Sequence, residues 1–167
     1  MVRIGVVSDT HVPGRARALP PVLFEALQGV AMILHAGDLT SSRVLEELGA
    51  IAPVYAVHGN MDPPELAQQL PARRIVEVEG VKIGLIHGHR PDRDRSRTPE
   101  WALGAFEGVQ CVVFGHTHVP MCERRGGVLL FNPGSPTDRR GQPQFSFGFL
   151  TVDGDRIEGE IQRFGGA

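Results

Sequence analysis

The chain has 167 residues, of which 41% are hydrophobic and 22% charged, and its formal net charge is −2. This length corresponds to one domain with a buried core, which excludes an intrinsically disordered chain. The charge balance argues against general binding of nucleic acids, and no apolar run approaches the ~20 residues of a membrane span. We expect residues 1–167 to form a single domain, located in the cytoplasm because the N-terminus lacks a secretory signal.

The first half of the chain alternates short apolar runs with amphipathic stretches. The apolar runs predict strands at Val2–Val7, Ala31–His35 and Pro53–Val57. Helices are expected at Leu19–Gln28, from Thr40 or Ser41 to Leu48, and at Pro63–Leu70. This βαβαβα order implies parallel strands joined by right-handed crossovers.

The second half is richer in strands. These are expected at Arg74–Glu79, Val81–His87, Gln110–Phe114, Val119–Arg124, Val128–Asn132, Phe145–Val152 and Arg156–Gln162. A helix is expected over Thr98–Glu107, and Gly80 separates a hairpin-like pair. The period-two recurrence of Phe145, Phe147 and Phe149 favours core packing over a dimer interface. Two sheets packed face to face, with helices outside, accommodate both halves.

The two cysteines lie in separate segments. Cys111 belongs to an apolar run and Cys122 to another short segment. Two unclustered cysteines form neither a disulfide framework nor a thiolate zinc site. We therefore expect both to be buried structural thiols.

The seven histidines are concentrated in five short segments that follow apolar runs. These segments are Asp9-Thr10-His11, His35-Ala36-Gly37-Asp38, His58-Gly59-Asn60-Met61-Asp62, His87-Gly88-His89 and Gly115-His116-Thr117-His118. Because parallel strands present their carboxyl ends at one edge of a sheet, we expect these side chains to converge. Residues two apart in extended backbone point the same way, so the pairs Asp9/His11 and His116/His118 are each expected to face a single site.

The side chains of these segments indicate the kind of metal. Imidazole, carboxylate and amide groups without thiolate suit Mn²⁺, Fe, Zn²⁺, Ni²⁺ or Co²⁺. The cluster offers more ligands than one ion takes, so two divalent ions bridged by a carboxylate are expected, with Mn²⁺ favoured. Paired ions ~3.5–4 Å apart form the clamp that is used in phosphate-ester hydrolysis.

Together, these segments resemble a known family. Asp9-x-His11, Gly37-Asp38, Gly59-Asn60, His87 and Gly115-His116-x-His118, in this order, resemble the calcineurin-like metallophosphoesterase superfamily. Ser8-Asp9-Thr10-His11, Gly88-His89 and Asn132-Pro133-Gly134-Ser135 resemble its small bacterial and archaeal phosphodiesterase branch. The resemblance extends from Val2 to about Gln162. It implies an α/β fold, a four-layer α-β-β-α sandwich of two mixed sheets flanked by helices.

The resemblance also implies roles for seven residues. It places Asp9, His11 and His118 on one metal, Asn60, His87 and His116 on the second, and Asp38 between the two. Asp38, Asn60 and His116 are then the catalytic residues, and a metal-bound hydroxide attacks phosphorus. Many members carry a histidine after Gly-Asn that is taken to protonate the leaving group. Here the residue is Met61, whose thioether cannot donate a proton, so a small-molecule phosphodiester with a good leaving group is the expected substrate.

Further polar residues lie in or near these segments and match no ligand position: His35, His58, His89 and Asp62. They either orient ligands through hydrogen bonds or are ordinary residues of strand ends and turns, and His58 or His89 is also a candidate replacement acid. Arg15 and Arg90 are candidate substrate contacts, together with Asn60. Arg90 opens the arginine-rich stretch 90–97, for which a solvated loop is the alternative.

Two other functions are compatible with these residues. One is a phosphomonoesterase or nucleotide phosphatase on the same metals, which the absent histidine disfavours. The other is a non-catalytic protein-binding scaffold, as in a membrane-trafficking subunit of the superfamily. Such a scaffold is expected to lose metal ligands, whereas all seven matched positions here hold suitable residues. A homo-oligomer is compatible with either function.

Overall fold

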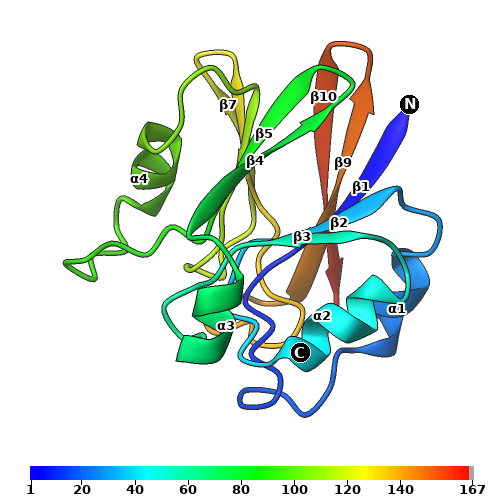
Figure 1. Ribbon diagram of the computed structural model, residues 1–167, viewed down its shortest axis with the longest axis vertical. Coiled ribbons are helices and arrows are strands. Elements are labelled where there is room, and N and C mark those ends of the chain that lie inside the picture. Colours follow the sequence, from blue (N-terminus) through cyan, green and yellow to red (C-terminus); the bar gives the residue numbers. More distant parts are fainter. Residues whose placement is uncertain (166–167) are drawn as a thin grey trace.

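The computed structural model describes residues 1–165, which form two five-stranded sheets and four helices (Figure 1). The first sheet contains β1 (Val2–Val7), β2 (Met32–His35), β3 (Val54–Ala56), β9 (Phe145–Asp153) and β10 (Arg156–Phe164). The second contains β4 (Arg73–Val78), β5 (Val81–Ile86), β6 (Cys111–Val113), β7 (Met121–Arg125) and β8 (Val128–Asn132). The helices are α1 (Pro21–Ala26), α2 (Ser42–Gly49), α3 (Pro64–Gln69) and α4 (Thr98–Gly104).

Both sheets are mixed. The first has the order β10-β9-β1-β2-β3, in which β1, β2 and β3 run parallel and β9 is antiparallel to β1. The second has the order β4-β5-β6-β8-β7, in which β5, β6 and β8 run parallel. The parallel arrangement expected for the first half of the chain is therefore confirmed. Its central strand β1 also pairs with the C-terminal hairpin, so the two halves of the chain share one sheet.

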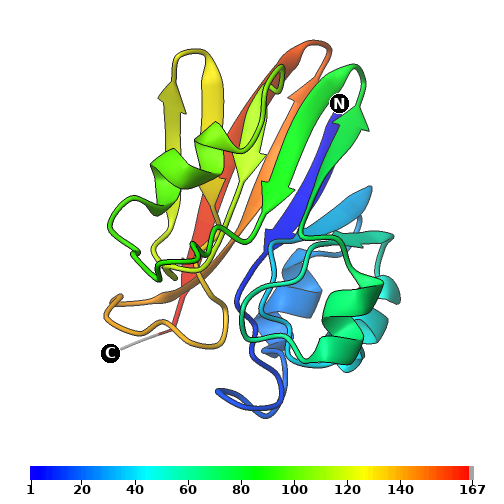
Figure 2. The same cartoon turned by 60° about the vertical axis from the view of Figure 1, so that its left-hand side comes forward.

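Three apolar clusters separate four layers. The first lies between the sheets and contains Ile4 of β1 and Phe131 of β8. The second packs Leu23 of α1 against Phe147 of β9, and the third holds Ala102 of α4 against the second sheet. Figure 2 shows α4 on one outer side, while α1, α2 and α3 lie on the other. This is the expected α-β-β-α sandwich.

Local sequence signals set several boundaries. Glu79 and Gly80 both have positive φ, of 54° and 81°, which suits the two-residue turn between β4 and β5. The side chain of Ser41 accepts a hydrogen bond from the N–H of Arg43 and caps α2. Helix α1 is shorter than expected because it begins only after Pro20, and α4 ends at Gly104 rather than at Glu107.

The cysteines and phenylalanines test two further expectations. Cys111 is buried, but Cys122 is exposed because β7 is an edge strand, so a buried thiol was the wrong prediction there. Phe147 and Phe149 are buried in the cluster beneath α1 and α2, which confirms core packing. Within residues 1–165, no helix combines the length and apolar character needed to cross a bilayer.

Candidate metal centre

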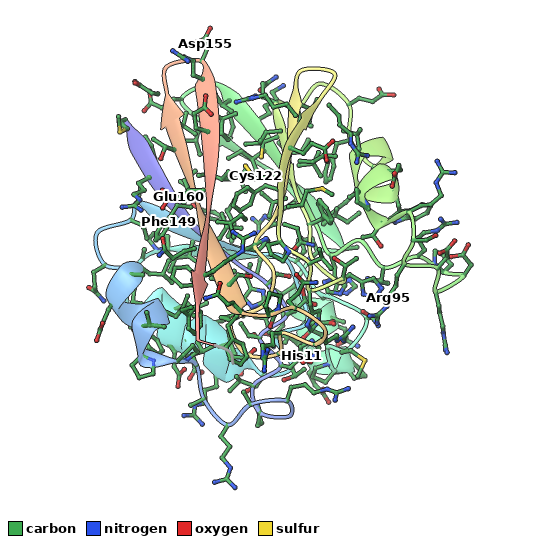
Figure 3. The ribbon with its side chains drawn as sticks, turned by 180° about the vertical axis from the view of Figure 1, so that it is seen from behind. His11, Arg95, Cys122, Phe149, Asp155 and Glu160 are labelled. Atoms are coloured by element: carbon green, nitrogen blue, oxygen red, sulfur yellow. The ribbon has the colours of Figure 1, made fainter. Side chains whose placement is uncertain are left out.

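The five histidine-containing segments meet at one end of the molecule. They follow β1, β2 and β3 of the first sheet and β5 and β6 of the second, so the carboxyl ends of two facing sheets contribute, rather than one sheet edge. Backbone hydrogen bonds join neighbouring segments: the N–H of Asp9 donates to Gly37 O, and the N–H of Gly115 donates to His87 O, both at 3.0 Å. Figure 3 shows His11 at this end and Asp155 at the opposite end.

The carboxylate of Asp9 is fixed through one oxygen and free through the other. Oδ2 accepts hydrogen bonds from the Ser8 hydroxyl at 2.7 Å and from the N–H of His116 at 3.0 Å. Oδ1 is buried and has no hydrogen-bond partner among the described residues, and it lies 3.4 Å from Nε2 of His118 and 3.9 Å from Nε2 of His11. A buried carboxylate oxygen left in this way is suited to a cation.

Asp38 is held in the same manner. Its Oδ1 accepts a hydrogen bond from the N–H of Met61 at 2.8 Å. Its Oδ2 lies 3.6 Å from Nε2 of His11 and 3.2 Å from Nε2 of His87. Oδ2 of Asp38 therefore lies between histidines that come from opposite sheets.

Two of the histidines have their tautomers fixed by backbone carbonyls. Nδ1 of His87 donates to Ala36 O at 2.8 Å, and Nδ1 of His118 donates to Asp138 O. In the neutral ring, the lone pair of Nε2 then faces the cluster in both residues. Nε2 of His118 and Nε2 of His11 are buried and have no hydrogen-bond partner among residues 1–165.

These donor atoms fall into two groups that share Asp9. One group is Asp9, His11 and His118, and the other is Asp9, Asp38 and His87; within each, the atoms lie within 4.8 Å of one another. The unpartnered, buried oxygen and nitrogen atoms fit divalent transition-metal ions, and no thiolate contributes. The structure thus brings five of the seven predicted ligand residues together, and that they bind metal stays a prediction.

Asn60 and His116 lie at the outer edge of this cluster. Oδ1 of Asn60 is 3.1 Å from Nε2 of His87, so it accepts a hydrogen bond when the His87 ring is protonated, and two acceptor atoms face one another when the ring is neutral with its proton on Nδ1. The ring of His116 stands 5.1 Å from that of His87, centroid to centroid. Both Asn60 and His116 also line a neighbouring pocket.

The cluster is electrostatically arranged to hold positive charge. Burial alone would lower the pKa of His87, but the carboxylates of Asp9 and Asp38 raise it to about 9. Burial opposes ionisation of Asp9, yet His87 and His118 hold the pKa of that carboxyl well below its usual range. Burial, helped by the charge of His87, lowers the pKa of His116 to about 4.

Backbone conformation explains why paired residues face the cluster, and it corrects an expectation. Asp9 and His11 have φ of 55° and 45°, and His116 and His118 have φ of 72° and 63°. The prediction of extended backbone for these pairs is therefore wrong, because all four residues adopt the left-handed backbone conformation. Asp38 is left-handed too, with φ of 58°. Such conformations are costly for residues other than glycine and concentrate at functional sites.

Two glycines permit the close approach of these segments. A Cβ on Gly59 would stand 2.1 Å from Oδ1 of Asp38, and one on Gly115 would stand 2.0 Å from Oγ of Ser8. No larger residue fits at either position without displacing a carboxylate or its donor. The glycine content of the sequence thus directly serves this site.

The residues that match no ligand position differ in their contacts. His35 is buried and satisfied: Nδ1 accepts from the N–H of Gly37 and Nε2 lies 3.1 Å from Oγ1 of Thr10. Asp62 accepts hydrogen bonds from three backbone N–H groups, described below, and so fixes turns rather than a histidine ring. His89 lines the pocket, with its ring 5.4 Å from that of His87, whereas His58 is half-buried and is not among the pocket residues.

The two candidate substrate arginines are both near carboxylates. Arg90 lines the pocket, but its guanidinium donates to Asp92 at 2.7 Å. Arg15 lies outside the pocket lining, and its Nε is 3.7 Å from Oδ2 of Asp138.

A loop that carries no metal-ligand side chain also supports the site. The hydroxyl of Ser135 donates to Asp9 O at 2.8 Å, and Nδ2 of Asn132 donates to Gly115 O at 3.2 Å. Thr137 donates to Thr10 O, and Asp138 supplies the carbonyl that His118 contacts. Sequence reasoning noted residues 132–135 only through the resemblance and missed Thr137 and Asp138, because a backbone carbonyl leaves no signal in the sequence.

Comparisons with known proteins agree with this geometry. The profile of the calcineurin-like phosphoesterase superfamily domain matches residues 2–155. A probable metallophosphoesterase of Methanothermobacter thermautotrophicus is 42% identical, over 97% of this chain and 92% of that protein. Phosphodiesterase YfcE of Escherichia coli K12 is 30% identical, over 92% of this chain and 89% of its own length.

A solved structure shares the fold. Wild-type Vps29 from Entamoeba histolytica, complexed with Zn²⁺, is 26% identical over 98% of this chain and 100% of that chain, with a TM-score of 0.76. At the level of the family, the expected class of metal-dependent phosphoric ester hydrolase is confirmed. Since the profile spans most of the chain and the relatives cover nearly all of it, the chain belongs to the calcineurin-like phosphoesterase superfamily.

Proposed function

We propose that this protein is a phosphodiesterase that acts on a small-molecule phosphate diester with the aid of two divalent metal ions, Mn²⁺ before Ni²⁺, Zn²⁺, Fe or Co²⁺. The observation that carries the proposal is the convergence of buried atoms that have no hydrogen-bond partner in the described part of the chain, above all Oδ1 of Asp9 and Nε2 of His11 and His118. Such atoms are costly to bury unless a cation compensates them.

Each ion has its own set of proposed ligands. Asp9, His11 and His118 hold one ion, while His87, Asn60 and His116 hold the other. Asp38 is proposed to bridge them, because its Oδ2 lies within 3.6 Å of Nε2 of His11 and 3.2 Å of Nε2 of His87. Bound together, two such ions lower the pKa of a water and neutralise charge on the phosphoryl oxygens.

The chain's own residues set the remaining chemistry. Asn60 and His116 face the pocket and position the scissile phosphate at the cluster. Ala36 O and Asp138 O keep the Nε2 lone pairs of His87 and His118 directed inward. Met61 lines the same pocket and is 57% exposed, and its thioether has no proton to give to a leaving group. Diesters that lose a weakly basic alcohol are therefore the proposed substrates.

Hydrolysis of bis(p-nitrophenyl) phosphate tests this proposal. With added Mn²⁺, the purified protein should release p-nitrophenolate faster from this diester than from p-nitrophenyl phosphate. The Asp38→Asn variant should lose this activity, whereas Asp155→Asn, in the exposed turn at the opposite end, should retain it. A preference for the monoester would indicate the phosphatase alternative. A wild-type rate no higher than that of Asp38→Asn would contradict catalysis and favour a protein-binding scaffold.

A further inference from the structure

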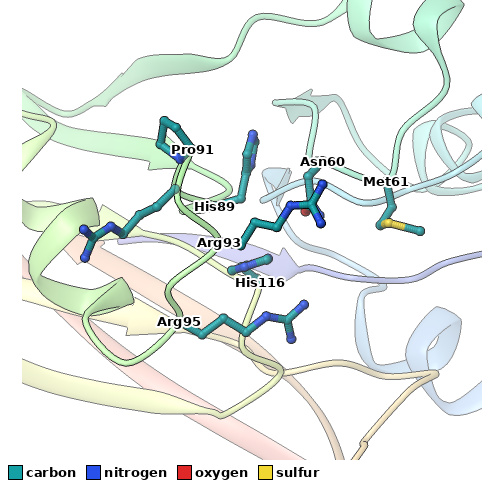
Figure 4. A pocket seen from close by; sticks show the side chains of 8 residues that line it. Asn60, Met61, His89, Pro91, Arg93, Arg95 and His116 are labelled. Carbon is teal, nitrogen blue, oxygen red and sulfur yellow. The ribbon is translucent and has the colours of Figure 1, made fainter.

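A pocket of about 570 Å³ opens beside the candidate metal centre (Figure 4). It is lined by Asn60, Met61, His89 and His116, and by four residues of the loop between β5 and α4: Arg90, Pro91, Arg93 and Arg95. The residues that line it include three arginines and no carboxylate. This volume is large enough for a substrate of nucleotide size.

The three arginines of this loop are not equivalent. The guanidinium of Arg90 is engaged by Asp92 at 2.7 Å and lies 5.5 Å from the centre of the Trp101 ring. Arg93 and Arg95 are exposed, and neither pairs with a carboxylate among residues 1–165. Figure 4 shows Arg93 reaching toward Asn60 and Met61, while Arg95 extends past His116.

The pocket lining places both arginines beside the candidate metal centre. Arg93 and Arg95 line the same cavity as Asn60 and His116, and Arg95 extends past His116 (Figure 4). Both arginines therefore offer planar guanidinium groups within the same cavity as the proposed phosphate-binding residues, and such groups match phosphate oxygens in a bidentate manner.

Charge balance indicates what these arginines bind. Two divalent ions with the carboxylates of Asp9 and Asp38 and one hydroxide would leave a charge of about +1, which already balances the single negative charge of a phosphodiester. Arg93 and Arg95 add two further positive charges at the pocket wall. A terminal phosphate monoester carries about −1.5 to −2 near neutral pH and would match this surplus.

We infer that Arg93 and Arg95 form a second phosphate subsite, so that the preferred substrate is a diester carrying a terminal phosphate monoester beside its scissile bond. This inference rests on the proposed phosphodiesterase function and deepens it. Arg93 and Arg95, rather than Arg90, are then the specificity-determining residues, because the charge of Arg90 is already paired with Asp92.

A matched pair of chromogenic esters tests the subsite. Thymidine 5′-(p-nitrophenyl phosphate) and its 3′-phosphorylated form differ by one phosphate; in both, water adds to phosphorus, the bond to the aryl oxygen breaks and p-nitrophenol leaves. The Mn²⁺-loaded protein should show a KM about tenfold lower for the 3′-phosphorylated ester, as expected for contacts to a charged group. The Arg93→Gln/Arg95→Gln variant should lose this preference while its KM for the unphosphorylated ester changes little.

The same loop supplies a matched control. Arg97 is exposed and lies outside the pocket lining, so Arg97→Gln removes one positive charge without touching the subsite and should keep the preference. Equal KM values for the two esters in the wild type would overturn the inference. An equal rise in KM for both esters in the double variant would overturn it as well, because the arginines would then contact the scissile phosphate.

A binding measurement separates this inference from the proposed activity. By calorimetry, thymidine 3′,5′-bisphosphate should bind the Mn²⁺-loaded wild type about tenfold more tightly than thymidine 5′-monophosphate, and the double variant should bind both alike. If neither ester is hydrolysed, the proposed function fails, whereas this difference in Kd still decides the subsite. Equal Kd values in the wild type would contradict it.

Discussion

Oδ2 of Asp62 accepts a hydrogen bond from the backbone N–H of Asp38 at 3.0 Å, which fixes the proposed bridging residue to a turn that follows a different strand. The same oxygen accepts from the N–H of Gly59 at 2.7 Å, and Oδ1 accepts from the N–H of Thr40 at 2.7 Å. Asp62 therefore links the segments that carry Asp38 and Asn60.

Asp62→Asn should disturb this link without changing side-chain size. In either orientation, the new amide group directs N–H donors at backbone N–H donors. We expect Mn²⁺ affinity to fall about tenfold or more and the free energy of unfolding to fall by about 1–3 kcal/mol. Calorimetric Mn²⁺ titration and urea unfolding measure the two effects. Asp155→Asn is the control, and unchanged Mn²⁺ affinity in Asp62→Asn would refute the positioning role.

Gly115→Ala should show how tightly the segments approach one another. The added Cβ would stand 2.0 Å from Oγ of Ser8 and 2.6 Å from Oδ2 of Asp9. The hydrogen bond from the Ser8 hydroxyl to Asp9 should therefore break. We expect a loss of about 1–3 kcal/mol in the free energy of unfolding, measured in urea. Gly104→Ala, on α4, should be neutral or stabilising by about 0.5–1 kcal/mol, because within residues 1–165 the added Cβ would meet no atom closer than 4 Å apart from its chain neighbours and its own helix backbone. Equal stabilities for the two variants would show that the contact is not tight.

Local patterns predicted most elements of this fold. The run Val2–Val7 gave a strand with the expected bounds, and Glu79-Gly80 gave the expected hairpin. Pairing between distant segments left no comparable signal: nothing local in β9 indicates that it lies beside β1. The division of the strands between two sheets was therefore expected only in outline.

The candidate site was predictable through residue types and their order, but not in its geometry. Histidine placement identified the cluster, while the left-handed φ of Asp9 and His11 contradicted the extended backbone from which their convergence was argued. In the arginine-rich loop no periodicity indicates which side chains face inward. Only the structure distinguishes the paired Arg90 from Arg93.

Acid should destabilise the fold through His35. Burial lowers the pKa of His35 to about 3, whereas in the unfolded chain it titrates near 6.5. Below pH 6.5 the unfolded state binds a proton that folded His35 does not accept, so the free energy of unfolding falls as pH falls toward 3.

The variant His35→Gln removes this contribution. Its stability near pH 7 should be lower than that of the wild type, because two buried contacts change. Its decline between about pH 6.5 and 4.5 should be shallower by about 1 kcal/mol per pH unit. Urea unfolding of metal-free protein at several pH values measures both. Parallel pH profiles for the two proteins would show that His35 is not the group responsible.

Met61→His should broaden the proposed activity. Met61 is exposed in the pocket next to Asn60, so an imidazole there would reach a leaving group that the thioether cannot protonate. A phenyl diester releases phenol, whose anion is more basic than p-nitrophenolate and so needs a proton more. We expect the substitution to raise the ratio of kcat for the phenyl diester to kcat for the p-nitrophenyl diester by up to about a hundredfold. Steady-state kinetics on the two diesters provide the comparison. An unchanged ratio would mean that the missing acid does not limit the reaction.

The most direct test of the central claim is the number of metal ions per chain, measured by elemental analysis after Mn²⁺ loading and removal of free metal. The wild type should retain about two ions, and Asp38→Asn about one or fewer, since its Oδ2 lies between the two histidine groups. About one ion or fewer in the wild type, or an unchanged number in Asp38→Asn, would contradict a centre of two ions bridged by Asp38.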